Sequence, residues 1–291
     1  MSAPGRASAP GIDLHLHSSF SDGLHPPERL GRLVREVGLE VVALVDHDET
    51  RGLEAFRAAA APVRCIDAVE LTVRASPGPL GSIHLLGYGI DPAAPALQAL
   101  ARQNRLAKRR QIEAILAELE RSEGIRVAWS EVAGERGEDA YVGRNQIAEV
   151  LVRRGHVKDR RKAFRRWLEA KRVPEVEVAG AAEGVAAIAA AGGIAVLAHP
   201  THHDLDRHLR ALLPLGLRGI EVHRPRANGS LLARIEGAAA RHGLLVTGGS
   251  DWHGHHPDPP IGTWRAPWEP LRPFLQALDD RAMAIPPGSA Q

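Results

Sequence analysis

The chain has 291 residues, 44% of them hydrophobic and 25% charged, and its formal net charge at pH 7 is +2. This composition is typical of a globular protein, and the length allows either one large α/β barrel or two ordinary domains. The single cysteine, Cys65, excludes an internal disulfide framework, and the most apolar window, residues 184–198, is too short to span a membrane, so we expect a cytoplasmic protein without a membrane partner.

The first predicted element is a strand over residues 12–17, Ile-Asp-Leu-His-Leu-His. Residues 1–11 before it have no apolar core, so we expect a disordered leader and no secretory signal. Successive side chains of a strand point to opposite faces, so the three aliphatic residues share one face and Asp13, His15 and His17 share the other. Two imidazoles at this spacing can converge on one metal ion. An edge strand with a wet polar face would give the same pattern, and the choice depends on the rest of the chain.

Short apolar runs then recur with helical segments between them, which predicts βα units and a largely parallel sheet. One helix begins at Pro26-Pro27-Glu28 and ends before Gly38, and another runs from Ala182 to Ala191 before Gly192. Further strands are expected at 41–45, 68–73, 82–88, 193–198, 219–223 and 244–249.

The middle of the chain does not follow this alternation of short apolar runs and helical segments. Apolar residues from 97 to 119 fall at helical spacing among Arg and Glu, and two more helices are predicted at 143–154 and 159–171. We therefore expect a helical insertion within an α/β barrel. The predicted boundaries are 11–96 and 181–285 for the two parts of the barrel and 97–180 for the insertion.

Charge is unevenly divided between these parts. The insertion holds nineteen Lys and Arg against thirteen Asp and Glu, a charge of +6, whereas the remainder carries −4. This division suggests an anionic substrate held by the insertion and cations held by the barrel. A pair of solvated Arg-rich helices would give the same count.

Polar side chains lie at or just beyond most of the predicted strands. Because the carboxyl ends of barrel strands form one face, we expect these side chains to meet at a single rim. Six imidazoles and three carboxylates exceed the needs of one tetrahedral zinc and suit two or three divalent ions such as Mn, Fe or Zn. The predicted ligands are His15, His17, Asp22, His47, Glu70, His84, His199, Asp251 and His253. The nearby His202, His203, His208, His255 and His256 are interpreted as solvated loop residues.

The order of these motifs resembles the PHP (polymerase and histidinol phosphatase) family of metal-dependent phosphoesterases. The motifs are His15-x-His17, Ser21-Asp22-Gly23, Asp46-His47-Asp48, Glu70, His84, Ala198-His199-Pro200 and Gly249-Ser250-Asp251-Trp252-His253. The resemblance spans residues 12–254 and implies a distorted (β/α)7 barrel with a trinuclear metal site, for which manganese is favoured. By motif, His15, His17, Glu70 and Asp251 would hold one ion; Asp22, His47 and His253 a second; and Glu70, His84 and His199 a third, with Glu70 bridging.

The insertion makes the chain most similar to the branch of this family that contains nucleoside 3′,5′-bisphosphate phosphatases and RNase AM, a 5′→3′ exonuclease on short RNA. That branch usually reads Gly-Arg-Pro-His where this chain has Gly143-Arg144-Asn145-Gln146. It often reads Ser-His where this chain has Pro225-Arg226-Ala227. The predicted metal ligands are therefore retained, while residues expected near the substrate are changed.

The functional hypothesis is hydrolysis of a nucleotide phosphate ester by a metal-activated hydroxide. The reaction would be that of a nucleoside 3′,5′-bisphosphate 3′-phosphatase, of a 5′→3′ exonuclease on short RNA, or both. Arg144, at a helix start, is the first candidate for binding a substrate phosphate, and Arg105 and Arg109 are weaker candidates. Asp46 and Asp48 are expected to orient ligand imidazoles.

Three alternatives remain open at this point. A histidinol-phosphate-type or other small-molecule phosphatase would share the metal motifs. Amidohydrolase chemistry also begins with His-x-His, but its common bridge is a carboxylated lysine, and all four lysines lie in the insertion. A non-catalytic metal-binding module would have lost ligands, and none of the expected ones is missing. The modest positive charge predicts no binding of long duplex nucleic acid, and the sequence leaves the oligomeric state open.

Overall fold

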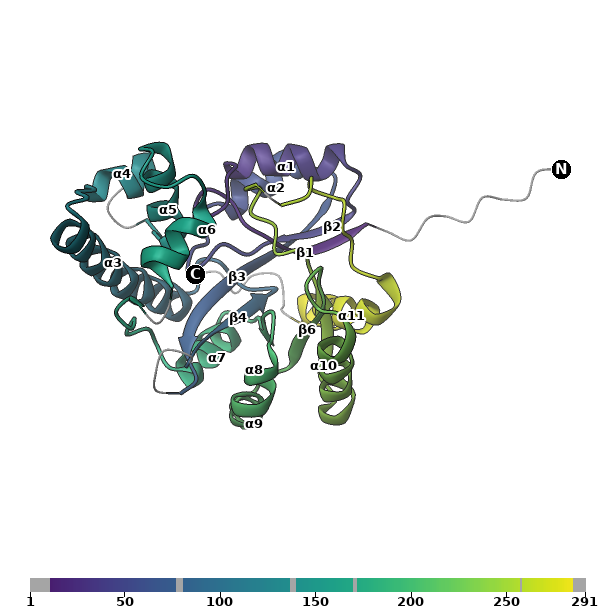
Figure 1. The fold of residues 1–291 in the computed structure, drawn as a ribbon. Coiled ribbons are helices and arrows are strands. Elements are labelled where there is room, and N and C mark those ends of the chain that lie inside the picture. Colours follow the sequence, from purple (N-terminus) through teal and green to yellow (C-terminus); the bar gives the residue numbers. More distant parts are fainter. Residues whose placement is uncertain (1–10, 77–80, 137–139, 170–171, 257, 285–291) are drawn as a thin grey trace.

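The computed structural model describes residues 11–76, 81–136, 140–169, 172–256 and 258–284, so the leader predicted at 1–11 lies outside the described residues except for Gly11. Seven strands form one sheet and follow one another across it in sequence order (Figure 1). The strands are β1 (Ile12–Leu16), β2 (Val41–Leu44), β3 (Arg64–Arg74), β4 (Ser82–Tyr88), β5 (Ile194–Leu197), β6 (Gly219–His223) and β7 (Leu245–Gly248). Every predicted strand is present, and β3 starts four residues earlier than expected.

The strand β4 departs from the predicted parallel arrangement. β3 and β4 form an antiparallel hairpin in which Glu70 pairs with Leu86 and Thr72 with His84. β4 is also antiparallel to β5, whereas the other neighbouring strands are parallel. The prediction of a largely parallel sheet is therefore confirmed except at β4, because the seven residues between β3 and β4 are too few for a parallel crossover.

The sheet curls toward closure without a continuous ladder between its edge strands. The gap is bridged by the segment after β7, where the His17 N–H donates to the Trp252 carbonyl at 3.0 Å and the Trp252 N–H donates to that of His15 at 3.3 Å. Gly249 permits this approach, because a Cβ at that position would lie 2.2 Å from the Cβ of His15. The structure thus confirms a mixed α/β fold with a curved seven-stranded sheet. The barrel that the sequence predicted is not fully closed.

Helices cover the outer side and one end of this sheet (Figure 1). The helix predicted to begin at Pro26-Pro27-Glu28 is confirmed as α1 (Pro27–Glu36), with proline at its start and Gly38 at φ +71° beyond its end. On the inner face, Ile12 and Leu14 pack with Phe274 of the C-terminal helix. The helices are α1 (Pro27–Glu36), α2 (Leu53–Ala60), α7 (Ala181–Ala190), α8 (His202–Arg207), α9 (Leu209–Leu212), η4 (Leu213–Leu215), α10 (Gly229–His242) and α11 (Trp268–Ala284).

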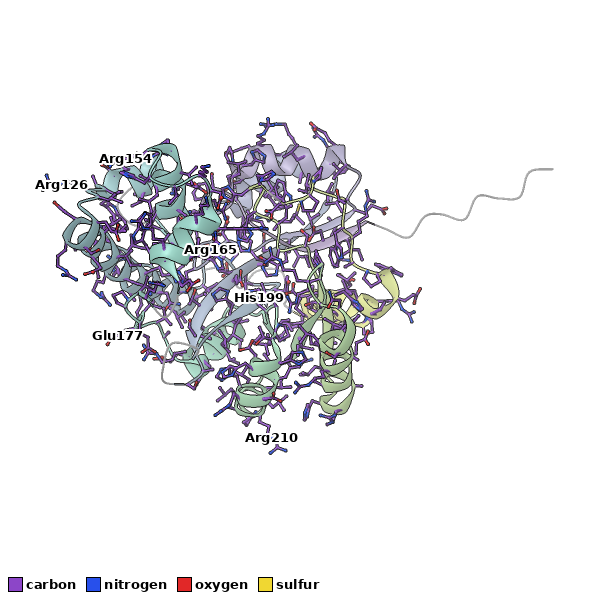
Figure 2. The ribbon with its side chains drawn as sticks, viewed as in Figure 1. Arg126, Arg154, Arg165, Glu177, His199 and Arg210 are labelled. Atoms are coloured by element: carbon purple, nitrogen blue, oxygen red, sulfur yellow. The ribbon has the colours of Figure 1, made fainter. Side chains whose placement is uncertain are left out.

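The middle of the chain forms a separate group of helices beside the sheet, with Arg126 and Arg154 on its outer side (Figure 2). Its elements are α3 (Pro95–Glu123), α4 (Trp129–Ala133), η1 (Gly134–Arg136), α5 (Arg144–Arg153), α6 (Arg160–Ala163) and the π-helix η2 (Phe164–Leu168). Ile112 of α3 and Leu151 of α5 belong to a core within this group, whereas Leu97 at the start of α3 packs with the sheet. The helix α3 therefore belongs to both cores, and the domain boundaries at 97 and 180 stay a prediction.

Across the described residues, the structure contains no helix with the length and apolar character needed to cross a membrane.

Candidate metal centre

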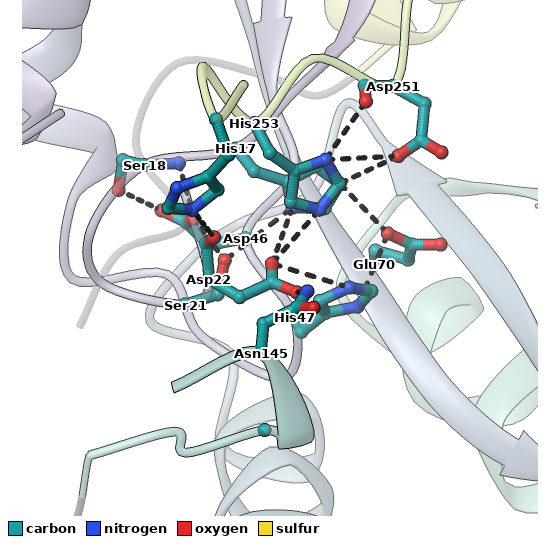
Figure 3. A network of polar contacts seen from close by, with 12 residues as sticks. His17, Ser18, Ser21, Asp22, Asp46, His47, Glu70, Asn145, Asp251 and His253 are labelled. Carbon is teal, nitrogen blue, oxygen red and sulfur yellow. Dashed lines mark hydrogen bonds and ion pairs between the residues drawn. The ribbon is translucent and has the colours of Figure 1, made fainter. Parts of the chain in front are cut away.

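The nine predicted ligands come together at one rim of the sheet, seven of them from strand ends and the loops after the parallel strands. Figure 3 shows several of them around Asp22, His47 and Glu70. His15 and His17 are completely buried, which contradicts the alternative of an edge strand with a wet polar face. Glu70 comes from β3, and His84 lies near the start of β4, which the hairpin brings to this same rim.

The first group of side chains is His15, His17, Glu70 and Asp251. The Nε2 atoms of His15 and His17 lie 3.1 Å apart, and each lies 3.2 Å from Glu70 Oε2. Asp251 Oδ1 lies 3.5 Å from His15 Nε2 and 3.4 Å from His17 Nε2. Ligand atoms bound at about 2.0–2.1 Å to one ion are separated by roughly 3.0–3.4 Å, so these four side chains have the spacing of a coordination shell.

The second group joins Asp22 to His47 and His253. Asp22 Oδ1 lies 3.1 Å from His253 Nε2 and 3.7 Å from His47 Nε2, and His17 lies close enough to join this group. Within the described part of the chain, His47 Nδ1 is buried and has no hydrogen-bond partner. Buried polar atoms are nearly always partnered, so this atom fits a site for a cation.

The third group lies on the other oxygen of the same glutamate. Glu70 Oε1 is 2.8 Å from both His84 Nδ1 and His199 Nε2, which are 3.2 Å from each other. His47 Nδ1 approaches Glu70 Oε2 at 3.3 Å. Because its two oxygens face different groups, Glu70 occupies a bridging position, and the nitrogen and oxygen donors suit Mn, Fe or Zn.

The charges of the carboxylates and imidazoles are strongly coupled. Burial alone would raise the pKa of Asp22, but the His253 and His47 imidazoles hold it well below its usual value. Burial likewise opposes ionisation of Glu70, whose pKa is held low by surrounding imidazoles, with that of His47 first among them. Burial lowers the pKa of His47 to about 3, against the attraction of Glu70 and Asp22. Ionised carboxylates and a neutral imidazole are the forms that bind metal ions.

Backbone strain concentrates at this rim. Asp48, His199 and Asp251 are the non-glycine residues with positive φ in the described ranges, at 49°, 25° and 55°. Each lies in the loop that follows a parallel strand. Such conformations are rare for residues with a side chain and persist where the surrounding structure enforces them, often at functional sites.

Glu221 is a residue that the sequence analysis missed. It is completely buried in β6, its Oε1 lies 2.8 Å from His15 Nδ1, and its Oε2 accepts the His199 backbone N–H at 2.8 Å. A carboxylate on the far nitrogen of a ligand imidazole fixes the orientation of the ring. A single acidic residue within the apolar run Gly-Ile-Glu-Val was the signal available in the sequence.

Asp46 and Asp48 make contacts that differ from those expected. Asp46 accepts hydrogen bonds from the backbone N–H and hydroxyl of Ser18 and from the hydroxyl of Ser21. Asp48 accepts from the Asn104 side chain at 2.7 Å and from the backbone N–H of Thr72. These carboxylates hold the ligand-bearing loops, while Glu221 contacts an imidazole directly.

The three predicted substrate arginines lie in different surroundings. Arg105 Nη1 donates to the Asp48 carbonyl at 2.6 Å, at the rim. Arg144 Nη1 donates to the Leu168 carbonyl at 2.9 Å, and its guanidinium lies over the Phe164 ring. Arg109, by contrast, pairs with Glu113 on the same helix, and its guanidinium stacks on Trp129, which also belongs to the insertion.

Lys108 is a second residue that the sequence analysis missed. Burial and the nearby Arg144 guanidinium lower the pKa of its ammonium to about 8, against the attraction of Asp48 and Asp22. It lies three residues after Arg105 and four after Asn104, on the same face of α3. This spacing was the signal in the sequence, but only the fold shows that this face turns toward the acidic rim.

The residues that replace the usual Pro-His of the resembled branch contact the metal-ligand loop directly. The Asn145 side chain donates to Asp22 Oδ2 at 2.7 Å, and that of Gln146 donates to the Ser21 carbonyl at 2.8 Å. The Tyr141 ring stacks on His47 with 5.3 Å between ring centroids. The insertion therefore covers one side of the rim.

Two histidines interpreted as solvated loop residues have other surroundings. His208 is buried, with 1% of its surface exposed, so that interpretation is wrong for this residue. The Nε2 atom of His255 lies 2.8 Å from the Asp22 carbonyl and 3.2 Å from Glu149 Oε1. The sequence marked His255 only by its place after the last predicted ligand.

Comparison with models of known protein families gives no match. A 3′,5′-nucleoside bisphosphate phosphatase of Chromobacterium violaceum is 36% identical to this chain over an alignment of 295 positions. The alignment covers 94% of this chain and 98% of the relative. A 5′-3′ exoribonuclease of Haemophilus influenzae is 32% identical over 197 residues, 66% of this chain and 70% of the relative. The solved structure of a candidate metal-dependent phosphoesterase of Bifidobacterium adolescentis has a TM-score of 0.80 at 30% identity, covering 92% of this chain and 96% of that chain.

Proposed function

We propose a substrate for this chain. The chain belongs to the PHP (polymerase and histidinol phosphatase) family of metal-dependent phosphoesterases, and it is a phosphoric ester hydrolase. The proposed reaction is removal of the 3′-phosphate of a nucleoside 3′,5′-bisphosphate. Cleavage at the 5′ end of short RNA is a second reaction proposed for the same site. The observation that carries the proposal is the convergence of five imidazoles on the two oxygens of one buried carboxylate, Glu70.

We propose that the three groups around Glu70 each hold one divalent ion and that manganese is preferred. When bound, such ions activate water as a nucleophile and neutralise the charge of the phosphoryl group. Glu221 holds the His15 ring in place, and Asp46 and Asp48 hold the loops that carry Asp22 and His47. With the insertion at 97–180 as its cover, the fold is proposed to be the distorted (β/α)7 barrel of the family.

A bisphosphate needs a second place for an anion besides the metal centre. Lys108, with Arg144 nearby, supplies positive charge near Asp22 and Asp48, on the side covered by the insertion. Beside His84 and His199 opens a pocket of about 340 Å³, bordered also by Thr201 and Asp204. We propose that the scissile phosphate lies between these two regions, with the distal phosphate toward Lys108.

The test is release of phosphate from adenosine 3′,5′-bisphosphate by the full chain in the presence of Mn²⁺. Asp251→Ala serves as the blank, and Glu269→Gln, which changes an exposed carboxylate on α11, is the matched control. Release by wild type and control, but not by the blank, is expected. Faster release from histidinol phosphate than from the bisphosphate would overturn the proposed substrate and favour the small-molecule alternative.

A further inference from the structure

The most strongly charged stretch of the chain is residues 153–166, here called the basic segment. It holds eight Arg and Lys and one acidic residue, Asp159. It includes the end of α5, all of α6 and the start of the π-helix η2. The Asp159 carboxylate caps α6 by accepting the Lys162 backbone N–H, and it makes no ion pair with another described residue.

Part of this charge has no counter-charge. Arg154 pairs with Glu131 and Arg166 with Glu123. Lys158, Lys162 and Arg165 are exposed, and none of the three makes an ion pair with another described residue. Like charges held together cost free energy through mutual repulsion, so an unpaired cluster of this kind is typical of a surface that meets an anionic partner.

These unpaired side chains border one open pocket of about 430 Å³. Its described lining is His156, Val157, Lys158, Lys162, Arg165 and Arg166, without an acidic side chain. Cations gathered around a hollow concentrate the positive potential there and attract phosphate groups more strongly than cations spread over a convex surface.

The basic segment connects to the metal centre through two side chains. Arg160 Nη2 donates to Asn145 Oδ1 at 3.2 Å. Asn145 Nδ2 in turn donates to Asp22 Oδ2 at 2.7 Å, and Figure 3 shows Asn145 beside Asp22. In Figure 2, Arg165 lies between the outer edge of the insertion, marked by Arg154, and the sheet. An extended anion with one end at Asp22 can therefore continue along the insertion.

We propose that the basic segment binds the phosphodiester backbone of a single-stranded oligonucleotide whose reacting end lies at the metal centre. This inference rests on the second reaction of the proposed function, and it adds the surface that would bind the strand beyond its reacting end. Electrostatic grooves of this kind follow a single-strand backbone over about 4–16 nucleotides. A single strand suits the site better than a duplex, because Glu70, His15 and His17 are completely buried and the insertion covers one side of the rim.

The test is the affinity of the full chain with Mn²⁺ for a fluorescent phosphorothioate RNA of about 12 nucleotides, which resists hydrolysis. The variant carries Lys158→Ala, Lys162→Ala and Arg165→Ala. The matched control carries Arg32→Ala, Arg210→Ala and Arg241→Ala, which remove the same charge from exposed positions on α1, α9 and α10.

Loss of three phosphate contacts reduces the slope of log affinity against log salt by about 2, and the affinity at moderate salt by roughly 100-fold. We expect both changes in the variant and neither in the control. Equal affinity of variant and wild type, or equally strong competition by a duplex, would overturn the proposal. Failure of the wild type to hydrolyse the bisphosphate would count against the proposed function alone, because this binding measurement does not depend on hydrolysis.

Discussion

Replacing Glu221 by glutamine tests whether this buried carboxylate sets the metal centre. The substitution keeps the size of the side chain and turns one of its two acceptor oxygens into an amide nitrogen. The two oxygens are both used, one 2.8 Å from His15 Nδ1 and the other accepting the His199 backbone N–H at 2.8 Å. Glu221→Gln therefore loses the negative charge beside His15 and one of these two hydrogen bonds.

Loss of a carboxylate that supports a ligand imidazole weakens metal binding by about 10- to 100-fold. This loss of affinity corresponds to about 1.4–2.7 kcal/mol of metal-binding free energy. The assay is titration of the metal-free protein with Mn²⁺, followed by electron paramagnetic resonance of the free ion, together with hydrolysis rates at saturating metal. Glu236→Gln, an exposed position on α10, is the control. An affinity of Glu221→Gln within about threefold of wild type would refute the reasoning, because it lies outside the range that such a carboxylate contributes.

Other substitutions test other parts of the same argument. Asn104→Ala removes one of the two hydrogen bonds that Asp48 accepts, and with it the side-chain hydrogen bonds of the Thr72 carbonyl and the Ala179 backbone N–H. Denaturant titration should therefore show a loss of about 2–4 kcal/mol in the free energy of unfolding, and a loss below about 1 kcal/mol would contradict this. Gly249→Ala places a Cβ 2.2 Å from that of His15, so activity and metal binding should both be lost, whereas full activity would show that the close approach is unnecessary. Lys108 has a pKa of about 8, so its ammonium loses its proton as pH rises through that value, and the KM for the bisphosphate should increase there in wild type but not in Lys108→Arg. The same increase in both proteins would remove Lys108 from the substrate site.

The sequence predicted that the nine candidate ligands meet at one rim because most of them follow a short apolar run, and strand ends meet at one rim in this class of fold. It missed Glu221 because a buried acidic residue in the middle of an apolar strand has no local signal except its charge. Lys108 and Asn104 were missed for another reason. Their helical spacing was visible, but their meaning depends on which face of a 29-residue helix turns toward the rim.

Charge is a similar case. The count of Arg and Lys in the insertion was readable from the sequence, but the counter-charges were not. Arg154 and Arg166 are paired with glutamates far away in the chain, whereas Lys158 and Lys162 are not paired with described residues. Only the tertiary structure separates the cations that stabilise the insertion from those left to meet an anion.

The antiparallel strand β4 makes the third metal group possible. In the β3–β4 hairpin, Glu70 is opposite Leu86 and Thr72 is opposite His84, so Glu70 and His84 are diagonal neighbours on one face. A parallel strand of seven residues would begin at the opposite end of the sheet, about 20 Å away. His84, the third residue of β4, would then point toward the wrong rim.

The register of this hairpin matters as much as its direction. A shift by one residue would turn His84 to the other face of the sheet, because successive side chains alternate. The 2.8 Å contact of His84 with Glu70 would then be lost, and with it a donor of the third group. The departure from the expected βα repeat therefore matters for the metal centre, since the hairpin brings His84, near the start of β4, to the same rim as the bridging carboxylate of Glu70.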